Sequence, residues 1–185
     1  MKNIIFLSVF QITLISTYAQ EPLSFEKVIK ADSIDKNTLF ASINDWFASS
    51  YNSSDDVLKM VDKEAGIIIG KGNFDFLNTT KSRFSCYHGY IKYTLKVYVK
   101  DNRYKVVIGD FIHFAGPDKP AMCNLGTITD LDVYATSGMA KKYLDFQNEA
   151  WSNSKLAAEV YSLEIFNILE EKTSNTGLAL VSDNW

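Results

Sequence analysis

His88 and His113 are the two histidines of the chain, and they are the side chains best suited to acid–base catalysis or metal binding. Both are expected on one face of two adjacent strands, where Asp110 or Asp118 would supply a carboxylate. In the strand register described below, however, Asp110 points to the opposite face, so three metal ligands do not come together. We therefore expect ordinary surface or half-buried histidines, with no metal, no cofactor and no catalytic residue.

A nucleophilic site is the alternative that the same residues allow. Cys86 lies two residues before His88, so a strand would place both side chains on one face. Neighbours on one strand are seldom oriented for proton transfer, and the chain has no Gly-x-Ser-x-Gly nucleophile elbow. A small envelope hydrolase that uses His113 with Asp110 or Cys86 is therefore the second hypothesis, behind a non-enzymatic function.

Cys86 and Cys123 are the only two cysteines, an even number in a chain that we expect to be exported. An oxidising compartment favours a disulfide between them. The predicted register places Cys86 opposite Pro117, a short loop away from Cys123. Two buried free thiols are the alternative, and we expect the disulfide.

A basic and aromatic patch is predicted on the polar face of two long strands. Its residues are Tyr90, Lys92, Lys96, Tyr98, Phe111 and His113. Aromatic rings beside ammonium groups suit an anionic glycan, a lipid headgroup or an acidic loop of an envelope protein. A solvated face, or one covered by the C-terminal helices, is the alternative. From this patch we predict a non-enzymatic binding or interaction domain whose small ligand, glycan or envelope-protein partner is unknown.

The N-terminus has the three-part pattern of a secretory signal peptide. Lys2 precedes an apolar run over residues 4–15, and Thr17 and Ala19 are small residues at the positions that a signal peptidase reads. We expect cleavage between Ala19 and Gln20. The run is shorter than the roughly 20 residues of a membrane-spanning helix, so no transmembrane anchor is expected. The protein is predicted to be periplasmic or secreted.

The charge balance argues against nucleic acid as a partner. The chain has 19 Lys and Arg residues against 22 Asp and Glu, a formal net charge of −3 at pH 7. Domains that bind nucleic acid usually carry a strongly basic patch and a basic overall charge. The aromatic content of 14% favours a packed sheet instead.

Hydrophobic periodicity predicts a strand, a helix, four antiparallel strands and two further helices. The expected strands are residues 23–31, 57–62, 67–76, 84–100 and 103–115, and the expected helices are residues 36–50, 139–151 and 155–172. The turn at Asp101 and Asn102 should have positive φ at both residues. Its register pairs Val99 with Tyr104, Leu95 with Ile108, and Ile91 with Ile112. Asp110 then falls on the apolar face unless a bulge at Gly109 turns it.

Three segments resemble a bacterial domain-of-unknown-function family with a TATA-binding-protein-like fold. They are Phe25-Glu26-Lys27-Val28-Ile29, the helix from Leu39-Phe40 to Trp46-Phe47, and Asp62-Lys63-Glu64-Ala65-Gly66-Ile67-Ile68-Ile69-Gly70-Lys71-Gly72. The resemblance covers about residues 23–115. It implies an exported protein of Gram-negative bacteria with a curved sheet and a helical layer, and it implies no activity.

The expected fold is α+β, with two layers: a mostly antiparallel five-stranded sheet and helices on one of its faces. The chain divides into a signal peptide (1–19), the sheet domain that resembles the family (20–115), a loop with C-terminal helices that pack on or extend it (116–172), and a flexible tail (173–185).

Overall fold

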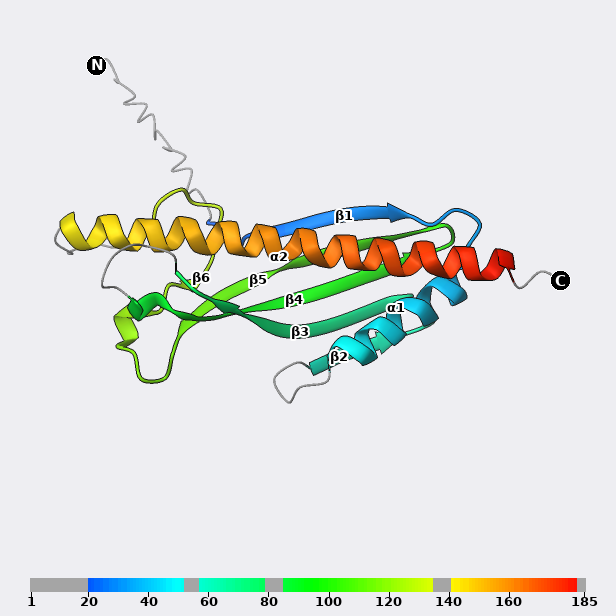
Figure 1. Ribbon diagram of the computed structural model, residues 1–185, viewed down its shortest axis with the longest axis horizontal. Coiled ribbons are helices and arrows are strands. Elements are labelled where there is room, and N and C mark those ends of the chain that lie inside the picture. The colour runs from blue at the N-terminus through cyan, green and yellow to red at the C-terminus, as the bar shows by residue number, and fades with distance from the viewer. Residues whose placement is uncertain (1–19, 52–56, 79–84, 135–140, 183–185) are drawn as a thin grey trace, which may run out of the picture.

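The computed structural model describes residues 20–51, 57–78, 85–134 and 141–182, so the predicted signal peptide, residues 1–19, lies outside the described residues. The elements are β1 (Ser24–Lys30), α1 (Lys36–Ser50), β2 (Val57–Asp62), β3 (Ile67–Phe76), the 3-10 turn η1 (Ser85–Tyr87), β4 (Gly89–Lys100), β5 (Arg103–Ala115), the 3-10 turn η2 (Ala121–Cys123), β6 (Gly126–Thr127) and α2 (Lys141–Ser182). Their order in the chain is shown in Figure 1.

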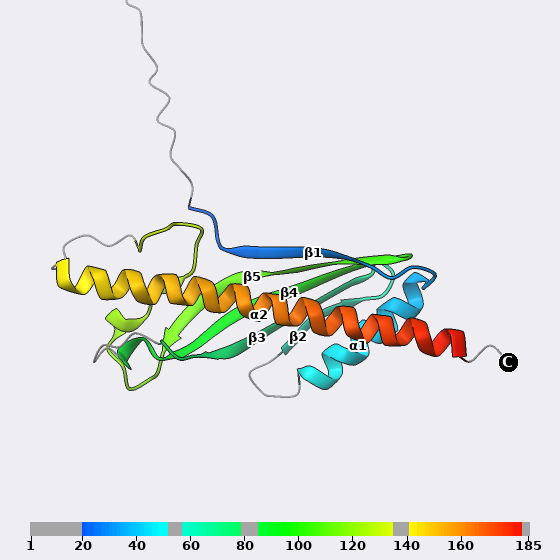
Figure 2. The same cartoon turned by 45° about the horizontal axis from the view of Figure 1, so that its top comes forward.

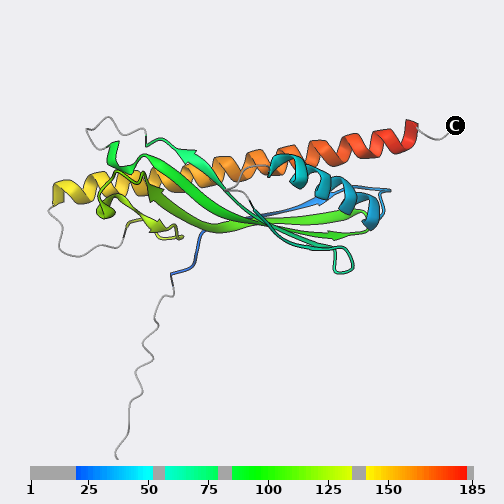
Figure 3. The same ribbon diagram turned by 90° about the horizontal axis from the view of Figure 1, so that it is seen from below.

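All strand pairs are antiparallel, in the order β1-β5-β4-β3-β2. The short strand β6 pairs with β5 at Ile112 and His113, beyond the end of β1. Both helices lie on the same side of this sheet, as the views in Figure 2 and Figure 3 show. The predicted two-layer α+β fold is therefore confirmed, with six strands in place of five because the two-residue β6 lies in a segment predicted as loop.

The hydrophobic core lies between the sheet and the two helices. Helix α1 begins at Asp35, whose Oδ1 accepts the backbone N–H groups of Asn37 and Thr38 at 2.8 and 3.1 Å, a typical N-cap. Its buried stripe faces the strands. The fully buried side chains of this core include Leu39, Ile43, Phe47, Ile68, Leu95, Val97, Ile108 and Leu169. Gly70 allows close packing here, because a Cβ at that position would lie 2.8 Å from the Phe47 ring.

Helix α2 is one continuous helix of 42 residues, so the predicted break at residues 152–154 is wrong. Ser154 is fully buried, and its hydroxyl donates to the backbone oxygen of Trp151 at 2.7 Å. Serine and asparagine cost a helix only about 0.5 kcal/mol each. The burial of Trp151 and Ala158 on either side of the expected break outweighs that cost, since apolar packing stabilises a helix more than propensity does.

The predicted flexible tail is also wrong in its first part. Helix α2 continues to Ser182, and Thr173 is 2% exposed, with its hydroxyl 3.1 Å from that of Tyr104. One residue earlier, Lys172 forms an ion pair with Asp45 of α1 at 2.8 Å. The C-terminal end of α2 is therefore fastened to β5 and to α1.

The register of β4 and β5 is confirmed near the turn and wrong beyond Gly109. Val99 pairs with Tyr104 and Leu95 with Ile108, as predicted, but Ile91 pairs with His113 instead of Ile112. A bulge inserts one extra residue opposite the stretch from Lys92 to Thr94. The bulge is centred on Asp110, which has a left-handed φ of 53°. Every residue of β5 after the bulge therefore points to the face opposite to the predicted one.

The turn between β4 and β5 differs from the predicted one, because only Asn102 has positive φ, at 62°. Its conformation is set by the connection between β1 and α1. The backbone N–H of Asn102 donates to the oxygen of Ile34 at 3.0 Å, and Asp101 Oδ1 accepts the backbone N–H of Lys36 at 2.8 Å. These tertiary bonds replace the local geometry of a type I′ turn.

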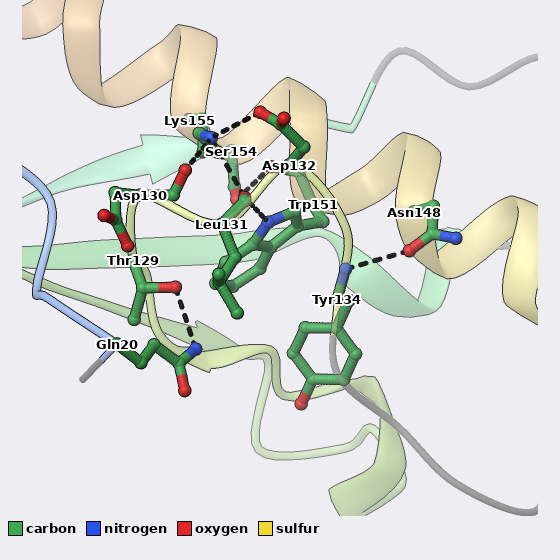
Figure 4. Close-up of polar contacts among 10 residues, drawn as sticks. All are labelled: Gln20, Thr129, Asp130, Leu131, Asp132, Tyr134, Asn148, Trp151, Ser154 and Lys155. Carbon is green, nitrogen blue, oxygen red and sulfur yellow. Dashed lines mark hydrogen bonds and ion pairs between the residues drawn. The ribbon is translucent and has the colours of Figure 1, made fainter. Parts of the chain in front are cut away.

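A loop after β6 fastens the first half of α2 to the sheet (Figure 4). The indole N–H of Trp151 donates to the backbone oxygen of Leu131 at 2.8 Å, and Lys155 Nζ donates to the same oxygen at 3.0 Å. The backbone N–H of Tyr134 donates to Asn148 Oδ1 at 2.9 Å. These bonds satisfy loop groups that would otherwise be buried without partners, so the loop and α2 pack as one unit.

Candidate functional site

The candidate site is the sheet face that carries no helix, which we call the open face. Four of the six residues predicted for the ligand-binding patch lie on it, at alternate positions of β4: Tyr90, Lys92, Lys96 and Tyr98. Helices α1 and α2 lie on the other face of the sheet, so they do not cover the patch. The strand period of two explains why the prediction for β4 holds.

Phe111 and His113 do not lie on the open face, and their predicted placement is wrong. Both are fully buried on the helical face, because the bulge at Asp110 shifts the alternation of β5 by one residue. Phe111 packs edge-on against Phe25, with ring centroids 6.0 Å apart. Their role in the structure is therefore packing of the core.

Phe114 is an open-face residue that sequence reasoning missed. Its ring stacks on that of Tyr90, with centroids 5.5 Å apart and planes 19° from parallel. Lys92 Nζ lies 4.9 Å from the Phe114 ring centroid and 5.7 Å from that of Tyr90, within cation–π range. The signal in the sequence was Asp110 on the predicted apolar face: a bulge that turns this carboxylate outward also moves Phe114 to the open face.

A pocket of about 470 Å³ opens between β2, β3, β4 and β5 on this face. Lys59, Lys71 and Lys92 line it, with Asp110 on the far side. Asp110 Oδ2 lies 3.8 Å from Lys96 Nζ, so the carboxylate charge is partly balanced by a lysine that does not line this pocket. A further lining residue, Thr94, is 6% exposed. The pocket is therefore basic, although the chain as a whole is acidic.

Tyr98 and Lys96 belong to neighbouring hollows of the same face. Tyr98 lines a separate hollow with Val28 and Lys105, and Lys96 lines a small one that also contains Thr94. The predicted patch is thus an extended surface, and three lysines line the pocket that contains Lys92.

His113 is held as a neutral imidazole by two backbone groups. Its Nδ1 accepts the backbone N–H of Leu125 at 3.1 Å, and its Nε2 lies 2.9 Å from the backbone oxygen of Tyr87. Only the tautomer with the proton on Nε2 satisfies both partners. Burial lowers the pKa of His113, and the bond to Tyr87 opposes this shift in part.

We expect the protein to lose stability as the pH falls below about 6.5, because of His113. The unfolded chain takes up a proton in this range, whereas the folded chain resists protonation. Stability is therefore complete above the unfolded pKa and declines below it. Denaturant unfolding at about pH 7.5 and about pH 5 measures this change.

The variant His113→Gln should show a smaller decline over that range than the wild type, whatever its absolute stability. His88→Gln is the matched control, since His88 is only half-buried and its Nε2 contacts a single backbone oxygen, that of Asn78. Equal declines in the wild type and in His113→Gln would contradict the assignment.

Cys86 and Cys123 lie side by side and are free thiols in this structure. Cys86 lies in η1, where residues 84–88 were predicted to begin the strand, and it lines one hollow together with Cys123 of η2. Burial, followed by the neighbouring Cys123 thiol, raises the pKa of Cys86 to about 12. Because the thiolate is the nucleophile of cysteine, Cys86 in this reduced state is a weak one.

The residues of the hydrolase hypothesis are not brought together. Asp110 is exposed on the open face, whereas His113 is buried on the helical face with both ring nitrogens bonded. Among the described residues, no group of three or more His, Cys, Asp or Glu side chains is placed to hold a metal ion. No helix in the described ranges is long and apolar enough to cross a membrane.

Comparison with known proteins agrees with this fold. Residues 25–113 match the family model described as a domain of unknown function (DUF4468) with TBP-like fold. The chain is similar to the crystal structure of a TBP-like protein from Parabacteroides distasonis, with 18% identity, a TM-score of 0.60, and 83% of this chain and 94% of that chain covered.

A second similar structure is a DUF4468 family protein from Bacteroides ovatus, with 11% identity, a TM-score of 0.55, and 80% of this chain and 86% of that chain covered. No curated protein matches the sequence. Both sources are Gram-negative Bacteroidetes. At these identities the two structures show the fold, and the predicted family resemblance is confirmed.

Proposed function

We propose a binding function for this chain, which belongs through residues 25–113 to the DUF4468 family with a TBP-like fold. In this proposal the protein is an exported, non-enzymatic domain that holds an anionic ligand on its open face. The observation that carries the proposal is the convergence of Lys59, Lys71 and Lys92 on one pocket. Within the described part of the chain, none of the three ammonium groups has a carboxylate at ion-pair distance. A net-acidic protein that gathers unpaired cations in a hollow provides an electrostatic site for an anion.

Export is proposed from the N-terminal sequence. The positive start, the apolar run over residues 4–15 and the small residues before Gln20 support cleavage by a signal peptidase. The protein would then act in the periplasm or outside the cell, where anionic glycans, lipids and proteins of the envelope are available as ligands.

A disulfide between Cys86 and Cys123 belongs to the same proposal. Both side chains line the same hollow, and an exported protein meets enzymes that donate disulfides. The two thiols would lose two protons and two electrons, which a thiol–disulfide oxidoreductase accepts as its own disulfide is reduced.

The binding proposal is tested on protein recovered from its own compartment. The full chain, with a C-terminal tag, is produced in a Gram-negative host and purified from the periplasm, and its mass is measured by native mass spectrometry. We expect a chain that begins at Gln20 and carries a stoichiometric anionic molecule. The triple variant Lys92→Ala, Lys96→Ala, Tyr98→Ala should lose that molecule, because it removes two cations and one ring from the open face.

The control variant is Lys63→Ala with Lys141→Ala, which removes two exposed cations that lie outside the open-face pocket. It should retain the bound molecule. A wild-type chain that carries no additional mass, or a triple variant that retains it in full, would refute the binding proposal.

A further inference from the structure

Thr94 is a buried polar side chain whose hydroxyl group has no hydrogen-bond partner within the described part of the chain. It lies in the middle of β4, is 6% exposed, and lines both the main pocket and the adjoining hollow. No hydrogen bond from the described residues reaches its hydroxyl group. Buried hydroxyl groups are nearly always bonded, because the loss of water is otherwise uncompensated. An unbonded hydroxyl group that faces a hollow is available to donate a hydrogen bond to a ligand.

Two cations stand next to this hydroxyl. Lys71 lies directly opposite Thr94 on β3, and Lys92 precedes Thr94 by two residues on the same face of β4. These positions make Lys71 and Lys92 diagonal neighbours, roughly 7–8 Å apart at the backbone. Both ammonium groups line one pocket. Like charges that share a pocket repel each other, so a single anion held between them would be favoured by both.

The rest of the pocket is larger than one oxyanion needs. Its volume of about 470 Å³ lies within the roughly 300–1,000 Å³ that is typical of small-molecule sites. Beyond the lysines the lining continues with the ring of Tyr90, the side chain of Ile112 and the amide of Asn73. A small apolar surface beside polar groups suits a ring that carries hydroxyl groups.

We infer that this pocket binds a small soluble acidic sugar, with its carboxylate, sulfate or phosphate group between Lys71 and Lys92 and a hydrogen bond from the Thr94 hydroxyl. The inference deepens the proposed function and rests on it, because it names the class of ligand at the same face. Thr94 acts as the donor that orients the oxyanion, and Lys59, which also lines the pocket, adds a third positive charge. Lys96 contributes indirectly, since it balances Asp110 at 3.8 Å and so reduces the repulsion of the ligand by that carboxylate.

The test is a titration of the isotope-labelled protein with glucuronate, followed by backbone NMR shifts. We expect saturable shifts centred on Thr94, Lys71 and Lys92, and no saturation with neutral glucose at the same concentrations. Thr94→Val keeps the side-chain shape and suits a strand, so the variant should fold. It should bind glucuronate roughly tenfold more weakly, the loss typical of one hydrogen bond to a charged group.

A second variant tests the charges. Lys71→Gln with Lys92→Gln should weaken binding at least as much as Thr94→Val, and it should also remove most of the salt dependence of the affinity. The matched control, Lys63→Gln with Lys141→Gln, changes the net charge equally and should bind as the wild type does. Unchanged affinity in Thr94→Val would overturn the role of the hydroxyl.

Three other outcomes would overturn the inference without touching the proposed function. NMR shifts on glucuronate addition that are centred on Tyr98 and Lys105 would place the sugar in the hollow lined by those two residues, outside the proposed pocket. Inorganic phosphate that binds as tightly as glucuronate would exclude a contribution from the sugar ring. The co-purified ligand could also be lost in the open-face triple variant and retained in Thr94→Val. That result would mean that the protein binds its ligand on the open face, but at a different site. Loss of the proposed function itself is recognised separately, as a wild-type chain that carries no ligand from the periplasm.

Discussion

Replacing Trp151 by alanine is expected to lower the free energy of unfolding by about 3–5 kcal/mol. Trp151 is 1% exposed, and its side chain is among the largest fully buried ones. Its ring packs edge-on against Tyr134 at 5.2 Å, and its N–H holds the backbone oxygen of Leu131. The variant leaves a cavity and removes a partner from a loop carbonyl, and each effect is destabilising.

The measurement is denaturant unfolding of both proteins, followed by far-ultraviolet circular dichroism. The matched control is Leu156→Ala, a large apolar residue of the same helix that is 58% exposed. Alanine there favours the helix slightly and removes little buried surface, so the change should stay within about 0.5 kcal/mol. A Trp151→Ala effect as small as that of the control would mean that α2 is not part of the cooperative core.

This result bears on the division of the chain at residue 115. Residues on both sides of that point share one hydrophobic core, from Leu39 and Ile108 to Trp151 and Leu169. A chain truncated before α2 would expose to water the part of the helical face that α2 covers, and exposed apolar faces promote aggregation. We therefore expect residues 20–115 alone to be insoluble or unfolded.

Reduction of the proposed Cys86–Cys123 disulfide is expected to cost the protein between about 3 and 5 kcal/mol. The bridge would close a loop that contains the whole β4–β5 hairpin, and it would join η1 to η2, where Cys123 is 3% exposed. Its main effect is to restrict the unfolded chain, so the native contacts change little.

The measurement is the melting temperature of the periplasmic protein with and without a strong reductant. A loss of this size in a chain of this length lowers the melting temperature by roughly 10 °C. The variant Cys86→Ala should melt as the reduced wild type does and should not respond to reductant. An intact mass that shows two thiols in the oxidised sample would refute the disulfide.

Local patterns were sufficient for most elements. The strands over residues 57–62, 67–76 and 103–115 and the helix over residues 36–50 have the predicted bounds. In each, the alternation or the helical stripe is set by residues within the element, and Asp35 marks the helix start by its own side chain. The family resemblance and the α+β fold followed from the same local information.

The candidate site was only half predictable. Four residues, Tyr90, Lys92, Lys96 and Tyr98, were assigned to the correct face because the extra residue of the bulge lies in β5 and leaves the alternation of β4 unchanged. Thr94 was not recognised, since a threonine inside a strand has no distinguishing pattern. Its significance depends on burial and on a missing hydrogen-bond partner, and both are properties of the packed sheet.

By itself, the sequence determined the element types, the two-layer fold and the expectation of a basic, aromatic sheet face, because these depend on periodicity and composition. Tertiary structure alone decided which residues share that face. The bulge at Asp110 directs Phe111 and His113 into the core and places Phe114 on the open face. A one-residue shift of this kind moves every later side chain of the strand to the opposite face of the sheet. Packing also decided that α2 is continuous, because the burial of Trp151 and Ala158 outweighs the weak helix preference of Ser152, Asn153 and Ser154.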